Sequence, residues 1–379
     1  MTAIRRLAGI AILLCALAPA AHAIDTPARH AILVDIGTGT VLLAKDADTQ
    51  MPPASMSKLM TISMLFEALT EGRVKLDDSF EVSEKAWKMG GSKMFVEVGK
   101  QARIEDLIRG IVVQSGNDAC IVVAEGLGGT EAAFATKMTE RAHELGLTDS
   151  SFINASGWPD PDHHMSARDL AKLATHLILD FPEYYKYFAE LEFTYAGIKQ
   201  GNRNPLLYKD IGADGLKTGH TEASGYGLVA SAVRDGRRLV LVVNGLESVN
   251  QRSRESARLL EWGFREFEAV KLFKAGETVA DADVWLGGET TVPLVPAEPV
   301  EVLLPRAGRN ELKVAVRYDG PVPAPITKGT RIATLTISAP EMEAKDVPLL
   351  AGADVERLGA VGRIFARLGH MVWGLASQQ

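Results

Sequence analysis

Residues 53–69 read PASMSKLMTISMLFEAL and join a candidate nucleophile to an apolar segment. Apolar residues recur at helical spacing from Ser57 to Leu69, and Gly72 supplies a stop, so the stretch predicts a helix. Ser55 and Lys58 are nearly one helical turn apart, which places a hydroxyl and an amine on one face. A serine nucleophile needs a neutral base, and a desolvated lysine can be that base near neutral pH. On this stretch alone, Ser55 as a simple helix cap remains the alternative.

Two further motifs carry groups that suit the same chemistry. Ser115 and Asn117 of SGN, between two predicted helices, offer a proton-relaying hydroxyl and an amide that can bind a substrate carbonyl or orient the lysine. Lys217 and Thr218 of KTG precede a predicted strand and present donors to a carboxylate, while Gly219 leaves room for close approach. Each triplet is common by chance. The three in this order and at these separations are not, and together they predict a catalytic serine centre.

The periodicity of apolar residues divides the chain into two predicted domains. Residues 24–268 show strand signals at both ends and helical patterns between them, with helices expected in 104–146, 166–179 and 252–267. Turn residues at 37–39 and at 235–236 predict two hairpins. We expect an α/β (α+β) fold, an antiparallel sheet covered by helices with an all-helical subdomain. Residues 269–350 have short alternating segments separated by Pro and Gly, which predict a small all-β domain.

Both ends of the chain have a distinct character. Residues 1–23 combine two arginines, an apolar run that is short for a membrane span and the small-residue triplet AHA, which predicts a cleaved secretory signal. Residues 351–379 place apolar and basic side chains on opposite helical faces. We expect this amphipathic helix to lie on a membrane surface as an anchor. A helix docked on the protein's own core is the alternative.

Composition excludes some classes of protein. Loss of the signal would remove two of the 41 basic residues and none of the 48 acidic ones, so a nucleic-acid partner is not expected. Cys120 would be the one remaining cysteine, which leaves no internal disulfide and is typical of a buried small residue. The cluster of Asp160, Asp162, His163 and His164 lacks ligand spacing and predicts a polar loop rather than a metal site.

The motifs together resemble the low-molecular-mass penicillin-binding proteins, specifically the D-alanyl-D-alanine carboxypeptidases with a C-terminal β domain. The resemblance rests on the three motifs, on PAS before the lysine, and on SARD (166–169), NRN (202–204) and DGLKTGHT (214–221). It covers nearly the whole chain. It implies a catalytic domain like that of serine β-lactamases and transpeptidases.

The resemblance also implies a reaction and a set of groups for it. Ser55 would attack the carbonyl between two terminal D-alanines of a peptidoglycan stem peptide, with no metal or organic cofactor, and β-lactams would acylate the same serine. The backbone N–H groups of Ser55 and His220 would hold the oxyanion. Lys217, Thr218 and Gly219 would line the substrate site. Arg203 would bind the substrate's terminal carboxylate with Thr218, and Arg252 resembles a further arginine of relatives in position. For both arginines an ordinary solvated side chain is the alternative.

Two other functions remain open from the sequence. A serine β-lactamase would share Ser55 and Lys58 but needs a base for fast deacylation, such as a loop glutamate, and the sequence indicates none. A cell-wall peptide-binding protein without turnover is the second alternative. The presence of every motif residue argues against it.

Overall fold

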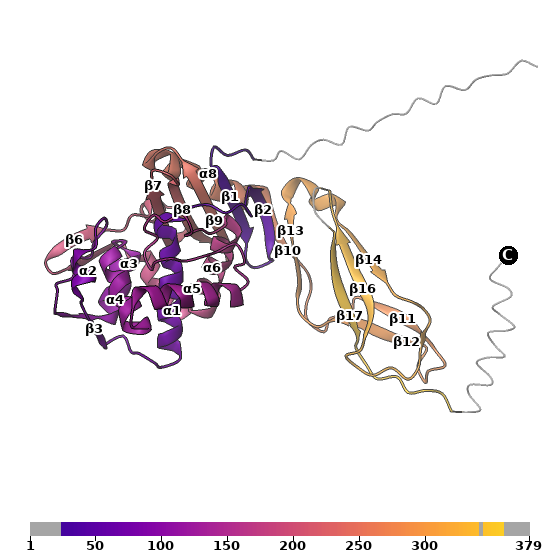
Figure 1. The fold of residues 1–379 in the computed structure, drawn as a ribbon. Helices are drawn as coiled ribbons and strands as arrows, with labels where there is room; N and C mark the ends of the chain where they lie inside the picture. Colours follow the sequence, from indigo (N-terminus) through magenta and orange to yellow (C-terminus); the bar gives the residue numbers. More distant parts are fainter. Residues whose placement is uncertain (1–23, 341–343, 360–379) are drawn as a thin grey trace, which may run out of the picture.

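The computed structural model describes residues 24–340 and 344–359. The predicted signal, residues 1–23, lies outside the described residues, and so does most of the predicted terminal helix. Figure 1 shows a body of helices and strands that is continued by an elongated body of strands. This arrangement confirms the expected fold class.

The first body is built on one antiparallel sheet of five strands. Its order is β2-β1-β9-β8-β7, so that strands from both ends of the domain lie side by side. Both predicted hairpins are confirmed, and the second turns at Asp235 and Gly236, which both have positive φ. The strands are β1 (His30–Asp35), β2 (Thr40–Lys45), β7 (Ala213–Thr221), β8 (Gly225–Arg234) and β9 (Arg237–Leu246).

Helices cover both faces of this sheet. Alternate residues of a strand point to opposite faces, so Ile32 of β1 packs with α1 and α6 while Leu33 packs with α8. The central strands β8 and β9 are apolar along most of their length because both of their faces are buried. The three helices are α1 (Lys58–Thr70), α6 (Ala167–Asp180) and α8 (Val249–Glu266).

The predicted helices of residues 104–146 are confirmed as α3 (Ile104–Val112), α4 (Asn117–Gly128) and α5 (Glu131–Glu144). Their subdomain also holds elements without a strong sequence pattern: α2 (Glu84–Lys88), α7 (Pro182–Tyr185), the antiparallel pair of β3 (Ser79–Glu81) with β4 (Gln101–Arg103), and the hairpin of β5 (Glu192–Tyr195) with β6 (Ile198–Gly201).

Ser166 and Asp169 of SARD lie at the start of α6 without forming a capping box, in which each side chain would bond the other residue's backbone N–H. Ser166 does cap the helix, since its Oγ accepts from Asp169 N at 3.1 Å. The Asp169 carboxylate instead accepts from Asp149 N and from the Ser150 hydroxyl, both at 2.8 Å. The cap is therefore one-sided, and the aspartate ties the helix to the preceding loop.

The second body is all β, as expected. Its larger sheet has the order β14-β16-β17-β12-β11-β15, and β10 pairs with β13 beside it. Isolated bridges tie Val355 to Ile326 and Arg357 to Gly287, so contacts of this body continue past β17. The prediction of a helix from residue 351 is therefore wrong for residues 351–359, which are not helical and pair with this body instead. The strands are β10 (Phe267–Phe273), β11 (Ala280–Trp285), β12 (Thr291–Pro296), β13 (Val300–Pro305), β14 (Lys313–Arg317), β15 (Val322–Pro323), β16 (Arg331–Ser338) and β17 (Lys345–Ala351).

The two bodies join without an intervening loop, because α8 ends at Glu266 and β10 begins at Phe267. Arg237 of the first body donates to Phe267 O at 2.6 Å and to Gly263 O at 2.7 Å. In the other direction, Arg306 of the β body donates to Arg265 O of α8 at 2.9 Å. These contacts fix the direction in which the β body leaves the catalytic sheet.

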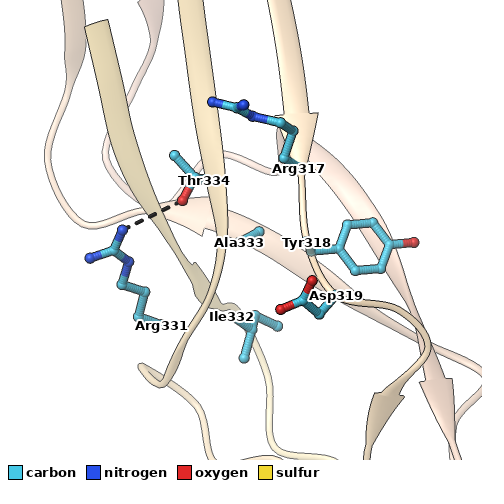
Figure 2. A pocket seen from close by; sticks show the side chains of 7 residues that line it. All are labelled: Arg317, Tyr318, Asp319, Arg331, Ile332, Ala333 and Thr334. Carbon is cyan, nitrogen blue, oxygen red and sulfur yellow. Dashed lines mark hydrogen bonds between the residues drawn. The ribbon is translucent and has the colours of Figure 1, made fainter.

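An open hollow of about 340 Å³ lies on the β body and is shown in Figure 2. Arg331 donates to Thr334 Oγ1 there at 3.5 Å, and Arg317 and Asp319 are among the other side chains that line the hollow. None of the residues that the sequence assigns to catalysis contributes to it. Within the described part of the chain, no helix combines the length and the apolar character needed to cross a bilayer.

Candidate active site

Ser55 lies on a single 3-10 turn, η1 (Ala54–Ser57), directly before α1. Ala54 has φ of 49°, which turns the chain sharply so that Ser55 is partly exposed. Ser57 points the other way, is fully buried, and donates to Ala54 O at 3.0 Å. Of the two serines in this turn, Ser55 alone faces the solvent side. It does not cap α1, because the N-cap position is Ser57 and no side-chain capping bond is made.

Lys58 reaches back along the turn, as the sequence predicts. Its Nζ donates to Ser55 Oγ at 2.8 Å and to Ser156 O at 2.5 Å. The side chain is fully buried, and burial lowers the pKa of Lys58 to about 8, with the Arg203 cation adding to the effect. The partial charges of the nearby Cys120 and Asp118 oppose it. An appreciable fraction of this amine is therefore neutral near pH 7.

Ser115 and Asn117 lie at the start of α4. Ser115 is buried in a left-handed conformation with φ of 59°, and Asn117 is the first residue of the helix. The Asn117 amide donates to Gly90 O at 2.9 Å. The next residue, Asp118, is fully buried and accepts from Met94 N at 2.8 Å, with Phe95 N and Val96 N as further donors. The SGN motif is thus tied to the loop of residues 89–96.

The KTG motif occupies β7, an edge strand of the sheet. Burial, followed by repulsion from Lys58 and Arg203, holds the pKa of Lys217 well below its usual range. A Cβ on Gly219 would lie 2.8 Å from Pro53 O and 3.0 Å from Met56 Cγ. The glycine therefore lets the turn that carries Ser55 pack directly on the strand.

The remaining predicted residues lie around the end of β7. His220 is exposed and stacks on Tyr226 with ring centroids 3.9 Å apart. Arg203 donates to Ser92 Oγ. Arg252, in the first turn of α8, is buried with its guanidinium 5.7 Å from the Tyr226 ring, and its Nε has no hydrogen-bond partner. Burial lowers the pKa of Arg252 to about 10.

These groups act on one another electrostatically. The charges of Lys58, Arg203 and Arg252 all lower the pKa of Lys217, so four basic side chains from different elements surround one region. The carboxylate of Asp118, which lies near Lys58, accepts hydrogen bonds from backbone N–H groups of the 89–96 loop. The region favours an anionic ligand, and it presents donors to any oxyanion formed there.

The other residues that the sequence raised are assigned no part in this chemistry. Cys120 is buried in α4, and burial raises its pKa to about 12, so it is a protonated thiol. His163 accepts from Ile153 N at 3.3 Å through Nδ1, and burial lowers its pKa to about 4. Residues 24–340 and 344–359 contain no group of three or more His, Cys, Asp or Glu arranged to hold a metal.

Sequence reasoning missed three supports of the site: Asp118, the 89–96 loop and the loop of residues 154–158. Asp118 follows SGN directly and could have been noticed as an acid next to a motif. The two loops gave no signal beyond turn-forming residues such as Gly90, Gly91, Asn154 and Gly157.

An antiparallel sheet covered by helices, with a serine and a buried lysine paired where the sheet meets the helical subdomain, defines an active-site serine hydrolase of the penicillin-binding class. Comparison with known proteins gives the family. Residues 17–248 match the D-alanyl-D-alanine carboxypeptidase family model, and residues 267–357 match the C-terminal domain of penicillin-binding protein 5. The chain belongs to this carboxypeptidase family and is a serine-type D-alanyl-D-alanine carboxypeptidase.

Relatives resemble the chain over most of its length. The carboxypeptidase DacC of Escherichia coli is 38% identical over 89% of this chain and 86% of its own, and DacA of Haemophilus influenzae is 35% identical over 92% and 91%. The crystal structure of penicillin-binding protein 5 from Haemophilus influenzae superimposes with a TM-score of 0.80 at 35% identity, covering 88% of this chain and all of that one. The crystal structure of penicillin-binding protein D2 from Listeria monocytogenes in its ampicillin-bound form superimposes with a TM-score of 0.59 at 28% identity, covering 64% of this chain and 99% of that one.

Proposed function

We propose that Ser55 is the acylated nucleophile of this carboxypeptidase and that Lys58 is its base. The observation that carries the proposal is the 2.8 Å contact between Lys58 Nζ and Ser55 Oγ inside a buried pocket that lowers the pKa of the lysine to about 8. Ser57, two residues further on, also has a hydroxyl in this turn. That hydroxyl is buried and donates to Ala54 O. Ser55 is the hydroxyl with both a base and access to solvent.

In the proposed acylation, neutral Lys58 accepts the Ser55 proton while Oγ bonds to the carbonyl carbon of the penultimate D-alanine. Backbone N–H groups of Ser55 and His220 hold the oxyanion, each worth roughly 3 to 4 kcal/mol. The C–N bond then breaks, and the proton on Lys58 passes through the Ser115 hydroxyl to the leaving nitrogen of D-alanine. Water attacks the ester while Lys58 takes the water's proton. Lys58 then returns that proton to Ser55 Oγ as the C–O bond breaks, which regenerates the hydroxyl and the neutral amine.

Specificity for a terminal residue requires recognition of a carboxylate. Arg203 and Thr218 are the groups we assign to it, with Lys217 and Arg252 supplying further positive charge around the end of β7. The unpartnered Nε of buried Arg252 supports its assignment, because a buried guanidinium nitrogen without an acceptor is costly and a substrate carboxylate would satisfy it. Asn117 would hold a substrate carbonyl from the α4 side.

The substrate is proposed to be the D-Ala-D-Ala end of peptidoglycan stem pentapeptides, with β-lactams as acylating inhibitors. One assay tests this against the two alternatives: the purified protein is incubated with a D-Ala-D-Ala pentapeptide and with labelled penicillin. We expect released D-alanine and a long-lived adduct. Rapid penicillin turnover without D-alanine release would indicate a β-lactamase, and neither activity would indicate a binding protein.

The location is proposed to be the periplasm, on the outer face of the inner membrane. Support comes from the signal pattern of residues 1–23 and from the amphipathic pattern of residues 351–379. We propose a catalytic domain over residues 24–266 and a β domain from Phe267 to Arg357, wider at both ends than the predicted range of 269–350. The β domain would act as a spacer between the membrane and the wall. Deleting the β domain should then abolish activity in cells while leaving isolated peptidoglycan a substrate; lost activity on short peptides would contradict a spacer role.

A further inference from the structure

The loop of residues 154–158 is closed by one side-chain amide. Asn154 Oδ1 accepts from Ser156 N at 3.1 Å, from Ser156 Oγ at 3.3 Å and from Trp158 N at 3.0 Å. Its Nδ2 donates to Trp158 O at 3.0 Å. A single residue therefore satisfies the polar groups of a tight turn that has little regular structure of its own.

The same loop is hydrogen-bonded to α1, which begins at Lys58, and to α5, and it packs on the turn that carries Ser55. Thr61, one turn after Lys58 on α1, donates to Ala155 O at 2.7 Å, and Glu131 accepts from Ala155 N at 3.1 Å. Gly157 touches the turn before α1 so closely that a Cβ would lie 2.0 Å from Ala54 O. These contacts hold the loop at a fixed position against α1. In that position Ser156 O lies 2.5 Å from Lys58 Nζ.

This contact matters because a neutral amine has two hydrogens and one lone pair. To act as a base, the lone pair of Lys58 must point at the Ser55 hydroxyl. A carbonyl that accepts one of the two N–H groups removes the freedom of the amine to rotate, so that the remaining directions are fixed. Without the carbonyl, a neutral Lys58 could still form but would face Ser55 only part of the time.

We propose that Asn154 is a positioning residue that holds the Ser156 carbonyl in place and thereby aims the Lys58 lone pair at Ser55. This inference rests on the proposed role of Lys58. It predicts a defect that high pH does not cure, because orientation, not the supply of neutral amine, is lost.

The groups that face Lys58 come from several elements. Asp118 and Cys120 lie on α4, Lys217 on β7, Arg203 before η3 (Pro205–Tyr208), and His163 follows the loop itself. These groups are the same in the wild type and in variants at position 154. A difference between the pH profile of the wild type and that of a variant therefore reports the 154–158 loop rather than these neighbours.

The test measures the second-order rate of acylation by a fluorescent penicillin from about pH 6 to about pH 10, where Lys58 titrates. For Asn154→Ala we expect the high-pH plateau to fall by ten- to a hundred-fold. Asn154→Asp keeps the acceptor for three N–H or O–H groups, so it should recover part of the plateau, with the midpoint moved to higher pH because a negative charge favours the ammonium.

Ser166→Ala is the matched control, because it removes a buried loop-to-helix hydrogen bond that does not involve Lys58 or the 154–158 loop. Its plateau should equal that of the wild type. A wild-type plateau in Asn154→Ala, with Ser55→Ala unable to form the adduct, would overturn the inference and leave the proposed function standing. An adduct that persists in Ser55→Ala would overturn the proposed function itself.

Discussion

Lys58 Nζ lies 2.8 Å from Ser55 Oγ, and the rest of the lysine is sealed inside the protein between α1, α4 and the 154–158 loop. Water cannot solvate the ammonium there, so the environment favours the neutral amine. The pair is a nucleophile with its own base on one turn of chain.

The rate of acylation should follow the neutral fraction of Lys58. With a pKa of about 8, roughly one amine in ten is neutral at pH 7 and nine in ten at pH 9, so penicillin acylation should rise about tenfold between these values and then level off. Ser57→Ala should show the same profile. A rate independent of pH over this range would contradict a lysine base.

The same burial makes Lys58 a source of pH-dependent instability. The folded lysine releases its proton above about pH 8, whereas the unfolded one keeps it to about 10.5, so the unfolded chain binds more protons between these values. Stability of the wild type should therefore rise there relative to Lys58→Met, by about 3 kcal/mol in total. Urea unfolding of both proteins at pH 7 and near pH 10.5 measures this, and a constant difference would refute it.

Gly157 should tolerate no side chain. Gly157 and Gly146 have nearly equal φ, 73° and 74°, but a Cβ on Gly157 would lie 2.0 Å from Ala54 O whereas one on Gly146 meets nothing within 4 Å. Gly146→Ala should cost about 1 kcal/mol of backbone strain, and Gly157→Ala should cost more than about 3 kcal/mol or shift the turn that carries Ser55. Thermal unfolding and the acylation rate distinguish the two, and equal effects would count against the packing described.

Binding of the substrate's terminal carboxylate by Arg203 and Arg252 can be tested with a matched pair of substrates. Wild type should prefer a pentapeptide with a free C-terminus over its C-terminal amide, and Arg252→Ala or Arg203→Ala should reduce this preference by about ten- to a hundred-fold through loss of a charge-assisted contact. Arg254 is exposed on the same helix as Arg252, so Arg254→Ala should keep the wild-type preference. An unchanged preference in both arginine variants would place the carboxylate elsewhere.

Membrane attachment should depend on the residues after Gly359. A chain ending there keeps the bridges of Val355 and Arg357 in the β domain, so it should stay folded and active. After cell fractionation we expect it in the soluble fraction and the full chain with the membranes. If the shortened protein still sediments with membranes, the terminal helix is not the anchor.

The sequence predicted the elements with strong periodicity and the residues with distinctive chemistry. Asp235-Gly236 located a hairpin to the residue, since both positions need positive φ, and the S-x-x-K spacing predicted the contact between Ser55 and Lys58. The family, the fold class and the carboxypeptidase activity followed from the motifs in combination.

The supports of the site could not be predicted in the same way. Asn154 acts through hydrogen bonds to residues two and four positions on, which any turn-forming asparagine can make. Its proposed importance comes from the contact between Ser156 O and Lys58 Nζ, two residues that are 98 positions apart in the sequence. The short strand pairs β3–β4 and β5–β6 likewise have too few residues for a period to show. Tertiary packing, not local pattern, sets these parts.

Mass spectrometry of the intact protein and of its peptides, after exposure to penicillin, identifies the residue that carries the acyl group. Ser55→Ala should gain no mass, while Ser57→Ala and the wild type should gain one penicillin, mapped to the peptide that contains Ser55. An adduct of undiminished yield on Ser55→Ala, or one mapped to another residue of the wild type, would contradict the account.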